Sequence, residues 1–398
     1  MQHTWADRFA SRASGLVSSE VRSLFSVASD PAYVNLAGGS PDVGALALEE
    51  IAELTRHVVA TRGAEALQYG TGQGAPELRE QIPVVMAEEG ISASPDEIIV
   101  TTGSQQALDL VCKVFIDPGD VIIAEAPSYV GALATFRAYE ADVVHVDQDA
   151  DGIVPDLLAA TLASLQATRR TPKLLYVIPN FQNPSGSTLA GARRREIVRI
   201  ADRFGVMIVE DNPYGLISFD TDPLPALKEL NPDGVVYLGS FSKIFSAGLR
   251  MGWAAAPPPV LEKLICASES SVLSPSMYSQ LTVSSYLAGN NLTRQVKAFR
   301  EIYRDKRDAM MLALADYLPE VRVNRPAGGF FTWLTLPDGI DSKGMLAEAM
   351  AAHVVYTPGT GFYADGRGHS NIRLSYSSPT PENIRAGIER LAGVVRHE

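Results

Sequence analysis

Cysteine and histidine are scarce in this chain. Only two cysteines occur in 398 residues, Cys112 and Cys266, and both fall inside apolar helical patterns. We interpret them as small core residues rather than a disulfide, which fits a reducing compartment and predicts a cytoplasmic protein. The six histidines are scattered without the spacing of metal ligands, so no metal site is predicted.

Positive charge and long apolar runs are also lacking. The 34 basic residues are outnumbered by 46 acidic ones, giving a formal net charge of −12. An acidic chain without a basic block is a poor candidate for binding nucleic acid or an anionic membrane. No apolar run reaches membrane-spanning length, and residues 1–8 lack the apolar core of a signal peptide. The length suffices for two domains and a large core.

A lysine stands in a hydroxyl-rich loop after an apolar strand, residues 235–238. The loop holds Ser240, Ser242 and Lys243, and Arg250 follows seven residues after the lysine. Poor solvation at the end of a buried strand lowers a lysine pKa, and the neutral amine can condense with an aldehyde as a Schiff base. Small hydroxyls and an arginine suit a phosphate. Together they suggest pyridoxal phosphate (PLP), although a surface lysine in a Ser-rich turn explains the stretch alone nearly as well.

A second strand end also suits a phosphate. The β-branched run at residues 98–101 leads through Gly103, Ser104 and Gln105 into an apolar helical pattern. A glycine turn followed by a helix start offers free backbone N–H groups at the positive end of a helix. The alternative is an ordinary strand-to-helix connection capped by Ser104. In combination with Lys243 and Arg250, we favour the phosphate site.

Three further strands end in residues that could hold a flat, charged ring. Tyr129 follows the strand at 121–124 and can cover a ring face, although a tyrosine packed in a turn is about as expected there. Asn183 lies in a Pro- and Gly-containing turn after the apolar run 174–178. Asp211 ends the strand at 206–209, where a carboxylate needs a positive partner unless it is solvated. A protonated pyridine nitrogen would be such a partner.

The motifs quoted so far resemble those of fold-type I PLP enzymes, the aspartate aminotransferase superfamily. The carriers are Ser-x-Ser-Lys followed by an arginine, Asn-Pro-x-Gly after a buried strand, and Ile-Arg-Leu near the C-terminus. The resemblance covers nearly the whole chain. Within the superfamily, the chain is most similar to the branch that holds 2-aminoadipate and kynurenine aminotransferases and MocR-type regulators. It implies an α/β fold, with a large domain holding a mostly parallel seven-stranded sheet and a small α/β domain.

The resemblance also implies roles for the cofactor residues. Lys243 would hold PLP and move protons, Asp211 would pair with the pyridine nitrogen, and Tyr129 would stack on the ring. Asn183 and Tyr214 would hold the phenolic oxygen. The phosphate would lie at the following residues: Gly103, Ser104, Gln105, Ser240, Ser242 and Arg250. Tyr69, in a glycine-rich stretch that is otherwise a flexible turn, matches a tyrosine that reaches the phosphate of the neighbouring subunit, which implies a homodimer.

Four residues are candidates for binding substrate. Arg373 lies between the apolar residues Ile372 and Leu374 in a strand pattern, so its charge needs an anionic partner. That partner is either a structural carboxylate of the protein or the α-carboxylate of the substrate. The family uses the matching arginine for the α-carboxylate. Asn183 and the main chain of Gly39, in a Gly-Gly-x-Pro loop, would border the substrate. A single arginine such as Arg22 on an amphipathic helix usually lies on the solvated face. In the aminotransferase branch named above, however, an arginine at the matching position can contact the side chain of the substrate.

The predicted function is transamination. An α-amino acid of the 2-aminoadipate, aromatic or large aliphatic class would give its amino group to a 2-oxo acid such as 2-oxoglutarate. Another PLP reaction at the same site, such as β-elimination, decarboxylation or oxidation, is the main alternative, and a PLP-sensing regulator is the weaker one. The expected organisation is an N-terminal segment at 1–40, a large PLP-binding domain at 41–275, and a connecting helix with the small domain at 276–398.

Overall fold

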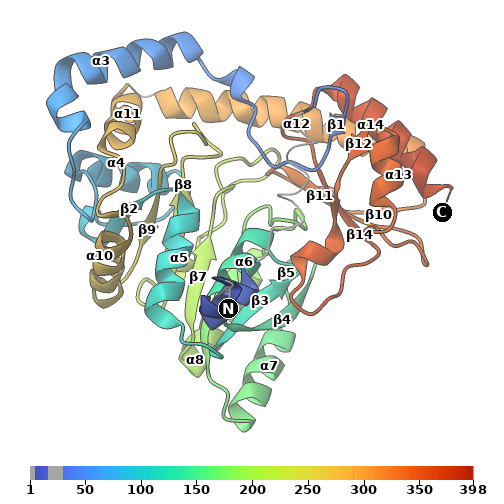
Figure 1. Cartoon of the computed structure of the whole chain (residues 1–398), viewed down its shortest axis with the longest axis horizontal. Helices are drawn as coiled ribbons and strands as arrows, with labels where there is room; N and C mark the ends of the chain where they lie inside the picture. The colour runs from blue at the N-terminus through green and yellow to red at the C-terminus, as the bar shows by residue number, and fades with distance from the viewer. Residues whose placement is uncertain (1–4, 17–29, 290, 398) are drawn as a thin grey trace.

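The computed structural model describes residues 5–16, 30–289 and 291–397. A sheet with the strand order β2-β9-β8-β7-β6-β3-β4-β5 forms its centre (Figure 1). The strands are β2 (Ile98–Thr101), β3 (Val121–Ala126), β4 (Asp142–Asp149), β5 (Gly152–Ile153), β6 (Pro172–Val177), β7 (Met207–Asp211), β8 (Val235–Ser240) and β9 (Gly252–Ala255).

The sheet is mostly parallel, as predicted. The neighbours β4-β3-β6-β7-β8 all pair in parallel, whereas β9 pairs antiparallel with both β8 and β2. Seven strands correspond to the prediction. The eighth, β5, is a two-residue edge strand antiparallel to β4, and two residues are too few to show a strand periodicity.

Helices cover both faces of this sheet because its strands are apolar on both sides. In β6, Leu174 and Tyr176 share a core cluster with α5 (Ser104–Phe115), α6 (Val130–Ala138) and α10 (Pro258–Val272). Leu175 and Val177, which alternate with them, pack with α7 (Pro155–Ala167), α8 (Gly191–Phe204) and the short α9 (Leu227–Leu230). The layers therefore follow directly from the strand alternation.

A smaller antiparallel sheet, β10-β11-β14-β13, lies beside the large one (Figure 1). Its strands are β10 (Arg322–Val323), β11 (Phe331–Thr335), β13 (Thr357–Pro358) and β14 (Asn371–Ser375), with α13 (Leu346–Ala351) and α14 (Pro381–Val395) nearby. The strand β1 (Val34–Asn35) joins this part of the chain by pairing in parallel with β12 (Val354–Val355). The earlier turn at Ser11–Gly15 packs instead against α6 beside the large sheet.

Long helices connect the two sheets. The 27-residue α12 (Asn291–Tyr317) runs from the region above the large sheet to the small one, following α11 (Met277–Ala288). α3 (Leu48–Ala66) and α4 (Pro76–Ala87) pack against α11. Single 3-10 turns complete the described elements: η1 (Trp5–Arg8), η2 (Ser11–Gly15), η3 (Val43–Ala45), η4 (Pro95–Glu97) and η5 (Gly359–Phe362).

The structure corrects one of the two cysteine predictions. Cys112 is buried in α5 as expected, but Cys266 is exposed on α10, so it is not a core residue. The apolar positions of α10 that face the core are Leu261 and Leu264 instead. Neither cysteine forms a disulfide.

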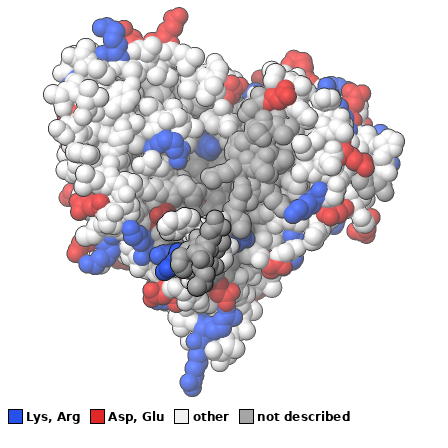
Figure 2. Space-filling view, viewed as in Figure 1, with Lys and Arg blue, Asp and Glu red and all other residues white. Residues whose placement is uncertain are grey.

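The helices of the described residues are too short or too polar to span a membrane, and charged side chains of both signs lie on the surface. None of the helices in the described ranges is long and apolar enough to cross a membrane. On the face shown in Figure 2, the acidic and basic side chains of the described residues are interspersed around the periphery.

Candidate active site

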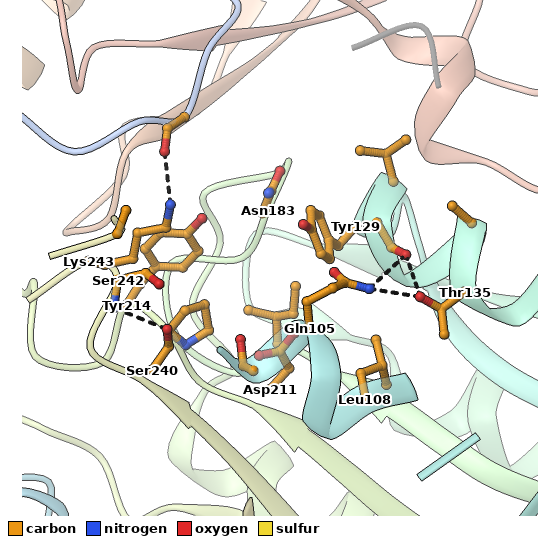
Figure 3. Close-up of a pocket in the computed structure, with 18 of the residues that line it drawn as sticks. Gln105, Leu108, Tyr129, Thr135, Asn183, Asp211, Tyr214, Ser240, Ser242 and Lys243 are labelled. Carbon is orange, nitrogen blue, oxygen red and sulfur yellow. Dashed lines mark hydrogen bonds between the residues drawn. The ribbon is translucent and has the colours of Figure 1, made fainter. Parts of the chain in front are cut away.

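A cavity of about 620 Å³ opens where the carboxyl ends of the parallel strands meet the N-terminal loop and the small sheet. This is the position in which open α/β sheets place their ligands. The predicted residues that line it are Gly39, Ser104, Gln105, Tyr129, Asn183, Asp211, Tyr214, Ser240, Ser242, Lys243, Arg250 and Arg373. In Figure 3, Lys243 and Tyr129 lie on opposite sides of the opening, with Asn183 between them.

Lys243 follows β8 and points into the cavity. Its Nζ donates a hydrogen bond to the carbonyl oxygen of Gly39 at 3.0 Å (Figure 3). Burial, together with the positive charges of Arg250 and Arg373, lowers the pKa of Lys243 to about 8. Roughly a tenth of the amine is therefore neutral at pH 7, far more than for an ordinary lysine, as a nucleophilic lysine requires.

Asp211 ends β7 at the floor of the cavity. Its Oδ2 accepts a hydrogen bond from the Tyr176 hydroxyl at 2.7 Å, whereas Oδ1 has no partner among the described residues. Burial raises the pKa of Asp211 to about 6, with the Tyr176 hydrogen bond acting in the opposite direction. An unpartnered, buried carboxylate oxygen facing a cavity is suited to a cationic N–H group.

The N-terminal end of α5 lies next to the side chain of Arg250. Gly103 caps the helix with φ +76°, and the first N–H groups after it have no acceptor within the helix. A Cβ atom on Gly103 would lie 2.5 Å from Nη2 of Arg250, so the glycine keeps this corner open. Arg250 reaches Ser242 Oγ at 3.5 Å, and the backbone N–H of Ser242 donates to Ser240 Oγ at 3.1 Å.

Tyrosines form the side walls of the cavity. Burial raises the pKa of Tyr129 and raises the pKa of Tyr214 well above its ordinary value. The hydroxyl groups of both side chains are therefore neutral at pH 7. The ring of Tyr129 folds back toward α6, where a Cβ on Gly131 would lie 2.5 Å from its hydroxyl oxygen. Gln105 beside it donates to Thr135 Oγ1 at 2.8 Å (Figure 3).

Arg373 comes from β14 and is 3% exposed. Its guanidinium donates to Asn183 Oδ1 at 2.9 Å, to the carbonyl oxygen of Ala37 at 2.5 Å and to Thr357 Oγ1 at 3.3 Å. These acceptors are all uncharged, and Nε has no partner among the described residues. Burial lowers the pKa of Arg373 to about 10. A structural ion pair, the alternative considered from the sequence, is not found within the described part of the chain.

These residues fit PLP. The free carboxylate oxygen of Asp211 suits the protonated pyridine nitrogen, and Lys243 suits the aldehyde. The corner formed by the α5 start, Ser242 and Arg250 suits the dianionic phosphate, with no Cβ at Gly103 to fill it. The cavity thus offers a separate complementary group for each charged or reactive part of the cofactor.

Among the described residues that the sequence predicts for the site, Gly103 and Tyr69 do not line the cavity. Tyr69 is 76% exposed and does not line the cavity within this chain. Arg22 lies outside the described residues, so its role stays a prediction. Gly39 does border the cavity, but its missing side chain is explained by Phe331, whose Cζ would lie 2.5 Å from a Cβ there.

The sequence reading missed two contributors. Tyr176 is fully buried in β6 and was taken as part of an apolar run. A phenol inside a buried strand needs a hydrogen-bond partner, and that signal could have pointed to Asp211 on the neighbouring strand. Phe331 in β11 lies with its ring centroid 4.2 Å from the guanidinium carbon of Arg373, a contact with no local sequence signal.

Known proteins resemble this chain over nearly its whole length. A family model described as aminotransferase class I and II matches residues 31–391. Aromatic-amino-acid aminotransferase 1 of Thermococcus litoralis is 40% identical over 98% of this chain and 94% of that protein. The 2-aminoadipate transaminase of Thermus thermophilus is 36% identical over 99% of this chain and 98% of that protein.

Solved structures agree with these matches. A kynurenine aminotransferase from Pyrococcus horikoshii superimposes with a TM-score of 0.94 at 36% identity, covering 98% of both chains. An α-aminoadipate aminotransferase from Thermus thermophilus, complexed with N-(5'-phosphopyridoxyl)-L-leucine, gives a TM-score of 0.92 at 35% identity, covering 99% of both chains.

Proposed function

Because the chain belongs to the aminotransferase class I and II family and is a PLP-dependent amino-acid aminotransferase, we propose a donor and acceptor for it. The donor is 2-aminoadipate, an aromatic amino acid or a large aliphatic amino acid, and the acceptor is a 2-oxo acid such as 2-oxoglutarate. The observation that carries this proposal is Arg373, a buried guanidinium beside Lys243 without an acidic partner in the described ranges.

Arg373 is suited to the α-carboxylate of the substrate. A buried cation with only neutral acceptors gains most from an anionic ligand, and its planar fork matches a carboxylate in two hydrogen bonds. Phe331 and Phe362 flank it, with ring centroids 4.2 and 5.1 Å from the guanidinium carbon. The choice of donor class is based on the names of the similar enzymes, which include an aromatic-amino-acid aminotransferase, a 2-aminoadipate transaminase and a kynurenine aminotransferase.

The remaining roles follow from position and charge. PLP, when bound, withdraws electrons from the substrate Cα and so acidifies its proton. Lys243, with a pKa of about 8, moves that proton as general base and then as general acid. Asp211 holds the pyridine nitrogen protonated, and Asn183 and Tyr214 hold the phenolic oxygen. The α5 start, Ser240, Ser242 and Arg250 bind the phosphate.

A homodimer in the cytoplasm is part of the proposal. Tyr69 is a large side chain that stands 76% exposed, next to a glycine-rich stretch and outside the cavity of its own chain. A second copy of the chain would cover it and bring its hydroxyl to the phosphate of the partner site. The net charge of −12 and the free thiols are compatible with a reducing cytoplasm.

The experiment is a Lys243→Ala substitution, with Lys263→Ala as the matched control. Lys263 is an exposed lysine on α10, paired only with its neighbour Glu262. With PLP, an amino acid and 2-oxoglutarate present, Lys243→Ala should lower 2-oxo acid formation by about 10²–10⁴-fold, the usual contribution of a general acid–base. Lys263→Ala should keep full activity. Full activity of Lys243→Ala would sink the assignment, and product formation that needs no acceptor would favour another PLP reaction.

A further inference from the structure

A buried polar network lies behind the cavity, and neither the family resemblance nor the site above accounts for it. Its members are Glu89, just after α4, Asn180, in the loop after β6, Asn212, directly after Asp211, and Arg194, in α8. All four are buried, with Arg194 at 0% and Glu89 at 8% exposure.

The hydrogen bonds of this network run in one direction. Arg194 Nη2 donates to Asn180 Oδ1 at 2.5 Å, and Asn180 Nδ2 donates to Asn212 Oδ1 at 3.0 Å. Asn212 Nδ2 then donates to Glu89 Oε2 at 2.7 Å. A guanidinium can only donate and a carboxylate can only accept, so the two charged ends fix the orientation of both amides. We call these four residues the amide relay.

Glu89 also packs against the main chain of the loop that carries Tyr214. A Cβ atom on Gly215 would lie 1.6 Å from Glu89 Oε2, so the carboxylate occupies the space left by that glycine. The Tyr237 hydroxyl donates to Glu89 Oε1 at 3.4 Å. The carboxylate therefore has donors from both β8 and the loop after β7, and a residue just after α4 anchors this loop from behind.

The relay joins the two loops that present the cofactor residues. Asn180 lies three residues before Asn183, and Asn212 is bonded to Asp211 in the chain. The Asn180–Asn212 bond thus ties the two loops together behind the cavity, in addition to the hydrogen bond between the Asn183 and Tyr214 side chains. It helps to set the spacing between Asn183 on one loop and Asp211 and Tyr214 on the other (Figure 3).

We propose that Glu89 is a positioning residue that acts through Asn212 and Asn180 to hold the Asp211 and Asn183 loops at the separation that PLP requires. This inference rests on the proposed function and adds a residue to it. If Glu89 loses its acceptor oxygens, Asn212 Nδ2 keeps only the Tyr237 hydroxyl, at 3.2 Å, as an acceptor among the described residues. The Asn212 amide is then held less firmly, its bond to Asn180 weakens, and the two loops can move apart. The affinity for PLP then falls.

The first measurement is a titration of the apoprotein with PLP, followed by absorbance, for three variants. Glu89→Leu should weaken PLP binding about tenfold, the effect of leaving one buried donor unpaired. Glu89→Gln should stay within about threefold of the wild type, because its amide oxygen still accepts from Asn212.

The control is Glu210→Gln. Glu210 is a fully buried glutamate next to Asp211, but it accepts from the backbone N–H groups of Leu227 and Lys228 at 3.0 and 2.8 Å, away from both loops. It should lower the melting temperature of the apoprotein while leaving PLP affinity unchanged. Equal weakening in Glu210→Gln and Glu89→Leu would overturn the inference, since the effect would then be general destabilisation.

A pH series gives a second readout that holds even if Glu89→Leu fails to fold. Burial raises the pKa of Glu89 to about 7, Glu210 adds to the rise, and Asn212, Tyr237 and Arg194 oppose it. Lowering the pH through 7 protonates Glu89 to a neutral group that, like Gln, still has one acceptor oxygen. The wild-type PLP affinity should therefore fall by at most about threefold, to that of Glu89→Gln, which lacks this transition. Asp211 and Lys243 titrate in both proteins, and their contribution cancels in the ratio.

Identical pH dependence in the wild type and Glu89→Gln, or wild-type PLP affinity in Glu89→Leu, would overturn the role of Glu89. A wild-type protein that binds no PLP would instead overturn the proposed function from which the inference starts.

Discussion

At the scale of single residues, the site is a set of buried charged groups whose hydrogen-bond partners among the described residues are all uncharged. Lys243, Asp211 and Arg373 all have pKa values moved toward neutrality by burial. Burial without a counter-charge is unfavourable for each of them, and cofactor and substrate supply the missing charges. The free-energy cost of burying these charged groups without a counter-charge is therefore the physical basis for binding the cofactor and the substrate.

Lys243 should capture PLP in a pH-dependent way. Its lowered pKa of about 8 means that the neutral amine, the reactive form, increases as the pH rises through 8 and is a minor species below it. The rate at which the apoprotein takes up PLP should therefore rise with pH and level off above 8, as measured by stopped-flow absorbance. In Arg373→Gln, removal of one positive charge should move this midpoint upward. A rate that keeps rising to pH 10 would show that the lysine is not perturbed.

Substrate affinity should depend on Arg373. Arg373→Gln removes the charge-assisted hydrogen bonds to the α-carboxylate and should lower kcat/KM for amino acids by about 10–10²-fold, mainly through KM. PLP affinity should change far less, because the guanidinium faces the substrate side of the cavity. The check is steady-state kinetics alongside a PLP titration. Unchanged KM with weakened PLP binding would place Arg373 at the cofactor instead.

At the scale of elements, strand ends and one helix start bring the site together. β7 and β8 end in Asp211 and just before Lys243, and α5 begins at Ser104 after the Gly103 turn. The N-terminal loop after β1 crosses the opening and supplies the carbonyl oxygens of Ala37 and Gly39. The catalytic groups are thus held by the ends of rigid elements, as precise chemistry requires.

Comparing Gly103→Ala with a control glycine variant separates the effect of backbone strain from the effect of blocking the proposed phosphate site beside Arg250. Gly119 has a similar positive φ of +86°, but a Cβ there would meet nothing within 4 Å, so Gly119→Ala is the matched control. Both variants should lose stability on the order of 1–3 kcal/mol, because each places a side chain on a backbone with a positive φ. Only Gly103→Ala should also weaken PLP binding, because its Cβ displaces Arg250. Equal PLP affinity in both variants would argue against this corner as the phosphate site.

The sequence predicted the elements whose signal is local. The apolar runs of β2, β3, β6, β7, β8 and β9 were found because these strands are buried on both faces. Two-residue strands such as β5 and β13 escaped because they have no periodicity. The site motifs were found through the resemblance, whereas Tyr176 and Glu89 were not. Their roles depend on contacts between segments distant in sequence, and local patterns do not encode these.

At the scale of the whole molecule, two sheets and the loops between them enclose the cavity. Residues from both contribute, with Arg373 in the small sheet and Asp211 in the large one. The pairing of β1 with β12 supports our proposal that residues 1–40 belong with the C-terminal domain, and the boundaries at 40 and 275 stay predictions. A movement of one sheet against the other would change the distance between the substrate and cofactor groups.

The proposed dimer predicts complementation between an inactive variant and an impaired one. Lys243→Ala lacks the lysine of its own site, and Tyr69→Phe would impair the site of its partner. After mixing and re-equilibration, heterodimers should contain one intact site each, so about one quarter of all sites regain full PLP affinity and activity. A matched mixture of Lys243→Ala with wild-type-like Lys263→Ala calibrates the exchange. No recovery would mean that Tyr69 acts within its own chain or not at all.

The central claim is that this site transfers an amino group through Lys243 and PLP. The most direct test is a half-reaction in which PLP-loaded protein is mixed with one amino acid and no acceptor, while absorbance and 2-oxo acid are followed. We predict one equivalent of 2-oxo acid per site, with loss of the PLP band, and recovery of that band when 2-oxoglutarate is added. Continued product formation without an acceptor, or a spectral change without any 2-oxo acid, would contradict the account.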